Sequence, residues 1–317
     1  MGDATQNLAK SLGAGIGGLL NATFGNAAEL IIALTMLRQG SQMYPLIKAS
    51  LTGSMIGNAL FVLGASFVAG GFLHRRQRFN RTAAGMGATL LALAAVGLII
   101  PAIFYHVARS GKVAGLEPHA VEFLSEEIAV VLAITYLVSL VFTLVTHRDL
   151  FGAETTSSNG GARSSQWPQI MKLLVATAVT AWVSHVLVGA IEHARDALGL
   201  NELFLGAVVI AVIGNAAEHT TAVVMAVKNE MDATLQITIG SAIQIALFVA
   251  PTLVIASLLM GQSPPLDLHF SLMETIVIAV TVVILAIVGQ DGESNWLEGV
   301  VMLAVYGIIA LAFFNLG

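Results

Sequence analysis

The chain reads Gly-Asn-Ala-Ala-Glu at residues 25–29 and repeats the same pentapeptide at residues 214–218. Both copies lie inside long apolar stretches that have the length of membrane-spanning helices. Each copy therefore places an amide and a carboxylate where an uncompensated charge is costly, and such residues indicate a functional site. Two copies in the two halves of one chain predict an internal repeat that builds one shared ion site.

The composition supports a membrane protein. The 317 residues are 56% hydrophobic and 10% charged, and the mean hydropathy is +0.85. A soluble domain carries about a quarter charged residues, so this chain must bury its apolar surface in lipid. The net charge of −5 gives no sign of a nucleic-acid-binding surface. Because cysteine is absent, disulfides and thiolate metal sites are excluded. We expect no cofactor.

Nine stretches have the length and composition of spans, which predicts an all-α polytopic membrane protein with about nine transmembrane helices. The linker 151–166 is rich in Ser, Gly and Thr, and we expect it to separate a first half, 1–150, from a second half, 167–317. The nine predicted helices are 15–37, 46–73, 82–106, 121–146, 167–191, 203–227, 235–260, 268–288 and 296–314.

The basic residues in the loops predict how the chain is oriented in the membrane. The loop 74–81 contains four arginines, so the positive-inside rule places it in the cytoplasm. Alternation then puts the N-terminus, the linker and the loops around Asn229 and Asp291 on the same side, and the C-terminus outside. No organelle signal is legible, so we expect a prokaryotic inner membrane.

The repeat extends beyond the pentapeptide. The string 53–62 matches the string 240–249 at Gly, Ser, Ile, Ala, Leu, Phe and Val, and each string opens the helix after a pentapeptide helix. Under the predicted orientation the first pentapeptide helix runs outwards and the second runs inwards. The halves are therefore expected to be inverted repeats with a site near the bilayer midplane.

The pentapeptides carry oxygen ligands. Asn and Glu are three residues apart in each copy, so they share a helix face. Amide and carboxylate oxygens suit hard cations such as Ca²⁺. A buried carboxylate holds either a proton or a cation, because a bare charge is costly there, and two carboxylates could exchange two protons for one divalent ion. The candidate cation- and proton-binding residues are Asn26, Glu29, Ser54, Asn215, Glu218, Ser241 and Gln244.

Four glycines are expected to break their helices or to let another backbone approach, namely Gly25, Gly53, Gly214 and Gly240. His185 and His219 are candidate proton relays, although a packing role fits either one. Asn58 is a weaker site candidate, and we expect Glu274 to be interfacial.

With these motifs in hand, the chain resembles the proton/calcium exchangers of the calcium/cation antiporter superfamily. The matching stretches are 17–29, 146–151, 214–219 and 240–248. The resemblance implies a cation antiporter fold and Ca²⁺/H⁺ exchange, with Ca²⁺ and H⁺ as substrates and Glu29 and Glu218 as the central acidic residues. It leaves Mn²⁺, other divalent cations and the oligomeric state open.

Members of this family usually have about eleven spans. We therefore expect the first two spans to be missing here. The second of them would be the counterpart of 167–191, and in the family these counterparts form a sliding gate beside the core. Similar proteins commonly have Ser-Glu where this chain has Ser184-His185, and some carry an acidic helix in the linker, where only Glu154 is acidic here.

Three alternatives were weighed. A transport-deficient truncated paralogue fits the missing helices, and a passive cation channel would need weak binding and an open path. An intramembrane zinc hydrolase needs a second His at a set spacing, which neither Glu218-His219 nor Glu192-His193 provides.

Overall fold

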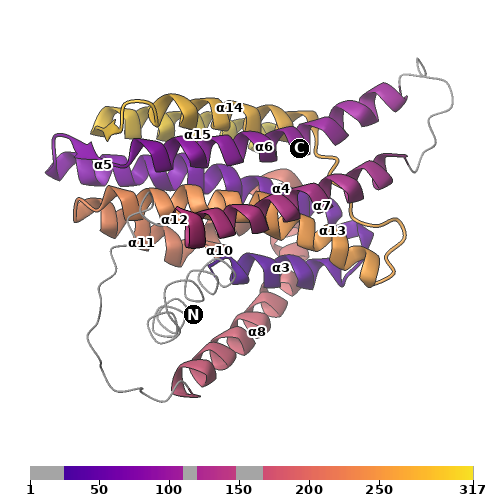
Figure 1. Cartoon of the computed structure of the whole chain (residues 1–317). Coiled ribbons are helices and arrows are strands. Elements are labelled where there is room, and N and C mark those ends of the chain that lie inside the picture. Colours follow the sequence, from indigo (N-terminus) through magenta and orange to yellow (C-terminus); the bar gives the residue numbers. More distant parts are fainter. Residues whose placement is uncertain (1–24, 110–119, 148–166, 317) are drawn as a thin grey trace.

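The structure is a computed structural model, and it describes residues 25–109, 120–147 and 167–316. Apart from two short strands, the elements of this part are helical (Figure 1). In chain order they are α3 (Ala27–Leu37), η1 (Ser41–Met43), α4 (Tyr44–Ile56), η2 (Gly57–Val62), α5 (Leu63–Leu73), β1 (Gln77–Arg78), α6 (Arg81–Arg109), α7 (Ala120–Val141), η3 (Phe142–Thr146), α8 (Trp167–Leu198), α9 (Glu202–Phe204), η5 (Leu205–Ile210), α10 (Ala211–Gly214), α11 (Ala216–Val227), α12 (Met231–Gln244), η6 (Ile245–Val249), α13 (Ala250–Leu259), α14 (Leu272–Val288), β2 (Glu293–Ser294) and α15 (Trp296–Asn315).

Within the described residues, six continuous helices are long and apolar enough to cross a membrane. A seventh span results if the bent pair Glu202–Gly214 and Ala216–Val227 is counted as one. The helices α3 and α14 are apolar but shorter. An all-α integral membrane protein is therefore confirmed, whereas the count of nine spans stays a prediction.

One end of the bundle gathers three loops that the orientation rule placed together. Strand β1 pairs antiparallel with β2, so the loop before α6 meets the loop before α15. Gln77 donates its side-chain amide to the carbonyl oxygen of Ala226 over 2.7 Å, and Asp232 accepts from the backbone of Asn80. The loops around Arg78, Asn229 and Asp291 thus lie on one side, as predicted.

The opposite end is formed by the loops around α3, α4 and α13. Gln262 donates to the carbonyl oxygen of Leu37, and Tyr44 donates to that of Pro264. The continuous helix Ser41–Leu73 therefore starts at this end and finishes at the β1 end. The continuous helix Met231–Leu259 runs the other way, so the two cross the bundle antiparallel.

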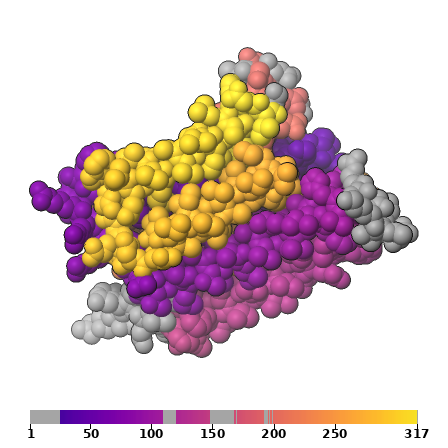
Figure 2. All heavy atoms as spheres, turned by 90° about the horizontal axis from the view of Figure 1, so that it is seen from above, coloured from indigo at the N-terminus to yellow at the C-terminus, as the bar shows by residue number. Residues whose placement is uncertain are grey.

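The two halves of the chain interleave. Figure 2 shows α14 and α15, in orange and yellow, lying against the purple segments that include α5 and α6. In Figure 1, α8 projects diagonally away from the other helices, and it packs against α3.

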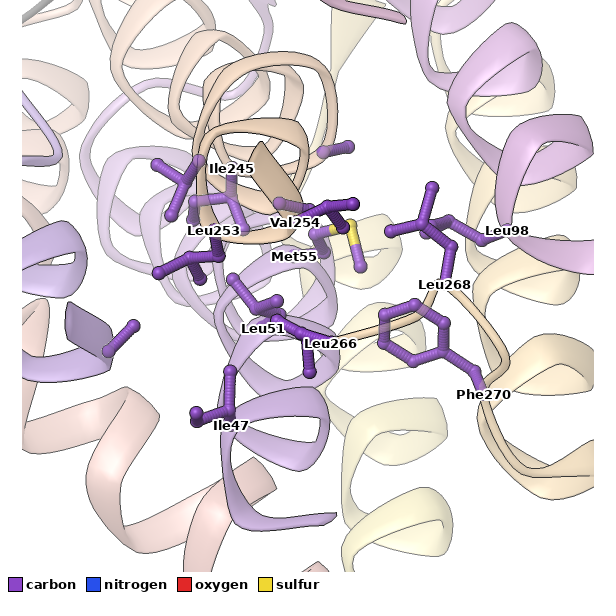
Figure 3. Close-up of a cluster of buried hydrophobic side chains, with 14 of the residues drawn as sticks. Ile47, Leu51, Met55, Leu98, Ile245, Leu253, Val254, Leu266, Leu268 and Phe270 are labelled. Atoms are coloured by element: carbon purple, nitrogen blue, oxygen red, sulfur yellow. The ribbon is translucent and has the colours of Figure 1, made fainter. Parts of the chain in front are cut away.

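The predicted helix 268–288 begins later than expected, at Leu272. Leu266, Leu268 and Phe270 are buried in the core shown in Figure 3, while the residues between them are only half-buried. This alternation is the period of an extended chain. Ser271 then caps α14 in a capping box with Glu274, which fixes the start of the helix.

Candidate functional site

The two pentapeptides have the same local structure. Asn26 (φ −100°, ψ 27°) and Asn215 (φ −97°, ψ 6°) leave helical geometry and precede α3 and α11 respectively. Each glutamate is then the third residue of its helix, where the positive end of the helix dipole stabilises a carboxylate. Gly214 ends α10, and the chain bends by 62° there, as expected for this glycine.

The two pentapeptides lie near one another. Helix α10, which ends at Gly214, contacts α3, and a Cβ atom on Gly214 would lie 3.8 Å from Glu29 Oε1. Exposed fractions are 2% for Asn26, 9% for Glu29 and 1% for Asn215. Both asparagines and Glu29 are therefore buried where the two motifs come together, while Glu218 is half-buried.

Hydrogen bonds cross between the halves. Ser241 Oγ donates to Asn26 Oδ1 over 2.6 Å, and Asn26 Nδ2 donates to Gln244 Oε1 over 2.7 Å. On the other side, Asn215 Nδ2 donates to Ser54 Oγ over 3.1 Å. Each pentapeptide asparagine thus binds the Gly-Ser string of the opposite half, and these bonds join five of the seven predicted side chains. We call these five residues, with Glu29 and Glu218, the cluster.

Asn58 belongs to this cluster as well. Its side chain is 1% exposed, and its Nδ2 donates to Ser241 Oγ over 3.0 Å. The sequence offered little signal for it, because the position aligned with Asn58 in the second string is Ile245. The cluster is therefore less symmetric than the repeat that builds it.

Three buried oxygens of the cluster have no hydrogen-bond partner among the described residues, namely Glu29 Oε2, Asn215 Oδ1 and Glu218 Oε2. A buried acceptor without a partner is costly, and carboxylate and amide oxygens are the ligands that Ca²⁺ takes. No group of three or more His, Cys, Asp or Glu side chains in the described ranges could hold a metal ion. Amide and hydroxyl oxygens would therefore have to complete the coordination of a cation.

Gly53 and Gly240 do not break their helices, and the expectation of breaks there is wrong, since α4 and α12 continue through them. Gly53 instead permits a close approach, because a Cβ atom would collide with the backbone of Ala207 in η5. For Gly240, none of the described residues lies within 4 Å of such an atom. Gly25 lies in the turn directly before α3.

The sequence pattern described as "Sodium/calcium exchanger protein" matches residues 1–145 and 169–315. The chain belongs to this family. It is 41% identical over 330 residues to a Ca²⁺/H⁺ antiporter of a Synechocystis species. This alignment covers 99% of this chain and 86% of that protein. It is 40% identical over 320 residues to the Ca²⁺/H⁺ antiporter ChaA of Bacillus subtilis, covering 100% of this chain and 88% of that protein.

A solved structure is similar as well. The structure of native YfkE superposes on this exchanger-family chain with a TM-score of 0.80 at 37% sequence identity, covering 98% of this chain and 87% of that one. The resemblance stated on the motifs alone is therefore confirmed at the level of the family and of the fold.

The two candidate relay histidines of this exchanger-family chain lie outside the hydrogen-bonded cluster. His219 packs edge-on against Phe61, with ring centroids 6.1 Å apart. His185 is exposed on α8, next to the buried Ser184. No hydrogen bond joins either ring to the cluster within the described part of the chain, so their relay role stays a prediction.

Proposed function

We propose that this chain is a secondary active transporter that exchanges Ca²⁺ for H⁺ across a membrane by alternating access to Glu29 and Glu218. The observation that carries the proposal is the pair of pentapeptide carboxyl groups, Glu29 and Glu218, each with a buried oxygen that lacks a hydrogen-bond partner in the described structure. The names of the two relatives, both Ca²⁺/H⁺ antiporters, support the same function.

The chemistry follows from the cost of a bare buried charge. Each carboxylate is neutralised either by a proton or by sharing a divalent cation. Binding Ca²⁺ therefore expels protons, and binding protons expels Ca²⁺. Two carboxylates release two protons for one Ca²⁺, which gives an electroneutral exchange. Measured net charge movement per cycle would contradict this stoichiometry.

We also infer that the halves 1–150 and 167–317 are inverted repeats joined by the linker 151–166. The antiparallel course of Ser41–Leu73 and Met231–Leu259 supports this arrangement, as do the hydrogen bonds that cross between the halves. It places the site near the bilayer midplane. The arginine-rich loop then puts the N-terminus in the cytoplasm of a prokaryotic cell and the C-terminus outside.

A passive channel fits the site less well. Conduction needs weak binding along an open path, whereas Asn26 and Asn215 are 2% and 1% exposed and both are hydrogen-bonded across the halves. This closed geometry favours a bound, occluded ion over free passage.

Proton-driven ⁴⁵Ca²⁺ uptake into vesicles containing the purified full chain tests the proposal. We expect uptake that a protonophore abolishes and that Glu29→Gln and Glu218→Gln each remove. Glu230→Gln is the matched control, because Glu230 is exposed in the loop before α12. Uptake by the wild type that persists with the protonophore would reject proton coupling.

A further inference from the structure

Three polar residues line one face of the outer half of α4. Tyr44, Lys48 and Thr52 are four residues apart in sequence, which puts them on one side of a helix. All three bind the segment 264–274. Tyr44 donates to the carbonyl oxygen of Pro264 over 3.0 Å, and Thr52 Oγ1 donates to Glu274 Oε1 over 3.1 Å.

The middle contact is an ion pair. Lys48 Nζ binds Asp267 and also donates to the carbonyl oxygen of His269 over 2.9 Å. We call the three contacts of Tyr44, Lys48 and Thr52 the polar ladder. Burial of charged and polar side chains is costly unless they are paired, and here the largely buried Lys48 and Asp267 side chains, 14% and 27% exposed, are paired with each other.

The sequence of the segment 264–274 explains why its polar groups lie outside the apolar core. Leu266, Leu268 and Phe270 are buried in this core, where Figure 3 shows Leu266 next to Leu51 and Leu268 next to Leu98. In an extended chain the intervening residues project the other way. Asp267 and His269 are thereby presented to Lys48.

The last contact, between Thr52 and Glu274, is buried within the protein. The expected interfacial position of Glu274 in the membrane stays a prediction. Glu274 is 5% exposed. Its Oε2 accepts from the backbone of Ser271 over 2.9 Å, and its Oε1 accepts from Thr52. A buried carboxylate needs such partners, so loss of the Thr52 hydroxyl removes one of its two hydrogen bonds in the described structure.

Another face of α4 is fixed by close backbone packing. A Cβ atom on Gly53 would collide with the backbone of Ala207, and one on Gly206 would lie 2.6 Å from the Cβ of Ala49. The ladder and this close packing leave α4 little freedom to rotate or slide. Ser54 follows Thr52 by two residues in α4, and its Oγ accepts a hydrogen bond from Asn215 over 3.1 Å.

We propose that Thr52 and Glu274 are positioning residues for the cation site. Their hydrogen bond sets the rotation and height of α4, and this aims Ser54 Oγ at the Asn215 amide. The proposal rests on the proposed function, since it concerns cation affinity at the same site. Neither residue is among the cluster residues, so both act through Ser54.

Thr52→Val tests the proposal, because valine keeps the shape and removes the hydroxyl. In vesicles with wild-type uptake as reference, we expect the KM for Ca²⁺ to rise about fivefold, the factor of one buried hydrogen bond. The maximal rate should stay within about twofold, and Thr52→Ser should restore the wild-type KM. Thr52→Ala should repeat the effect and serves if the valine variant does not fold.

A double variant separates positioning from simple destabilisation. In a Ser54→Ala background, Thr52→Val should no longer raise the KM, because the group that it positions is gone. An unchanged KM in Thr52→Val, or an equal rise in both backgrounds, would overturn the proposal. A lower melting temperature with an unchanged KM would assign Thr52 a structural role only. Absence of wild-type uptake would instead reject the proposed function.

Discussion

Ser241, in the second half of the chain, donates its hydroxyl proton to the side-chain oxygen of Asn26, in the first half, across 2.6 Å. The reciprocal bond joins Asn215 to Ser54 over 3.1 Å. Each asparagine is therefore held by a serine of the other half. The site forms only where the halves meet, so a relative movement of the halves must change the site itself.

The two serines are not equivalent, which gives a prediction. Ser241 binds both Asn26 and Asn58, whereas the described bond of Ser54 is with Asn215. We expect Ser241→Ala to raise the KM for Ca²⁺ about fivefold more than Ser54→Ala does, because it removes one more buried hydrogen bond. Ca²⁺ uptake measured over a range of concentrations checks this. Equal effects would mean that the Asn58 contact does not contribute to affinity.

Substitution by alanine should have different effects at Gly53 and at Gly214. At Gly53 a methyl group would collide with the backbone of Ala207, so Gly53→Ala should destabilise the protein by about 1–3 kcal/mol. At Gly214 the methyl group would lie 3.5 Å from Ile32 Cδ1 and 3.8 Å from Glu29 Oε1, which are ordinary contacts. Gly214→Ala should therefore fold normally and weaken Ca²⁺ binding.

Thermal unfolding in detergent and ⁴⁵Ca²⁺ uptake separate the two outcomes. A normal melting temperature for Gly53→Ala would contradict the close approach of α4 and η5. A wild-type KM for Gly214→Ala would show that the space beside Glu29 is not used by the ion.

The chain has no cysteine, so single cysteines can report the orientation. Arg75 and Ser41 are exposed at opposite ends of the bundle. In intact cells, a membrane-impermeant thiol reagent should label Ser41→Cys and should reach Arg75→Cys only after the cells are opened, because arginine-rich loops stay inside. The reverse pattern would invert the proposed topology and leave the site unchanged.

Much of the site was predictable because its residues are repeated. Asn26, Glu29, Asn215 and Glu218 were found from the pentapeptides, since a carboxylate in an apolar stretch is costly without a function. The contacts between halves were not predictable, because periodicity within a helix does not say which distant helix it meets.

The burial of Glu274 and the start of α14 both depend on contacts that hydropathy does not show. Thr52 and Ser271 pair with the oxygens of Glu274 and allow its burial within the protein. The start of α14 was placed too early because Leu268 and Phe270 are apolar in an extended segment, and mean hydropathy does not distinguish this from helix. Their alternation with Asp267 and His269 was the signal that was available.

His269 yields the last prediction, on pH. Burial lowers its pKa below the ordinary 6.5, against a raising effect of Asp267, and Lys48 and His106 lower it further. Its ring stacks on Tyr105 with centroids 3.9 Å apart. Because the folded state binds the proton more weakly than the unfolded state, this histidine favours folding fully above its ordinary pKa. That contribution is lost as the pH falls below about 6.5.

When the pH is lowered from about 7.5 to about 5.5, the melting temperature of the wild type should therefore fall relative to that of His269→Phe, since phenylalanine keeps the stack without a proton to bind. Melting temperatures of both proteins across this range, in detergent without Ca²⁺, provide the measurement. Parallel curves for the two would mean that His269 does not titrate in this window. A steeper loss in His269→Phe would reverse the assigned sign. Either result would mean that protonation of the half-buried His269 imidazole does not destabilise the folded protein.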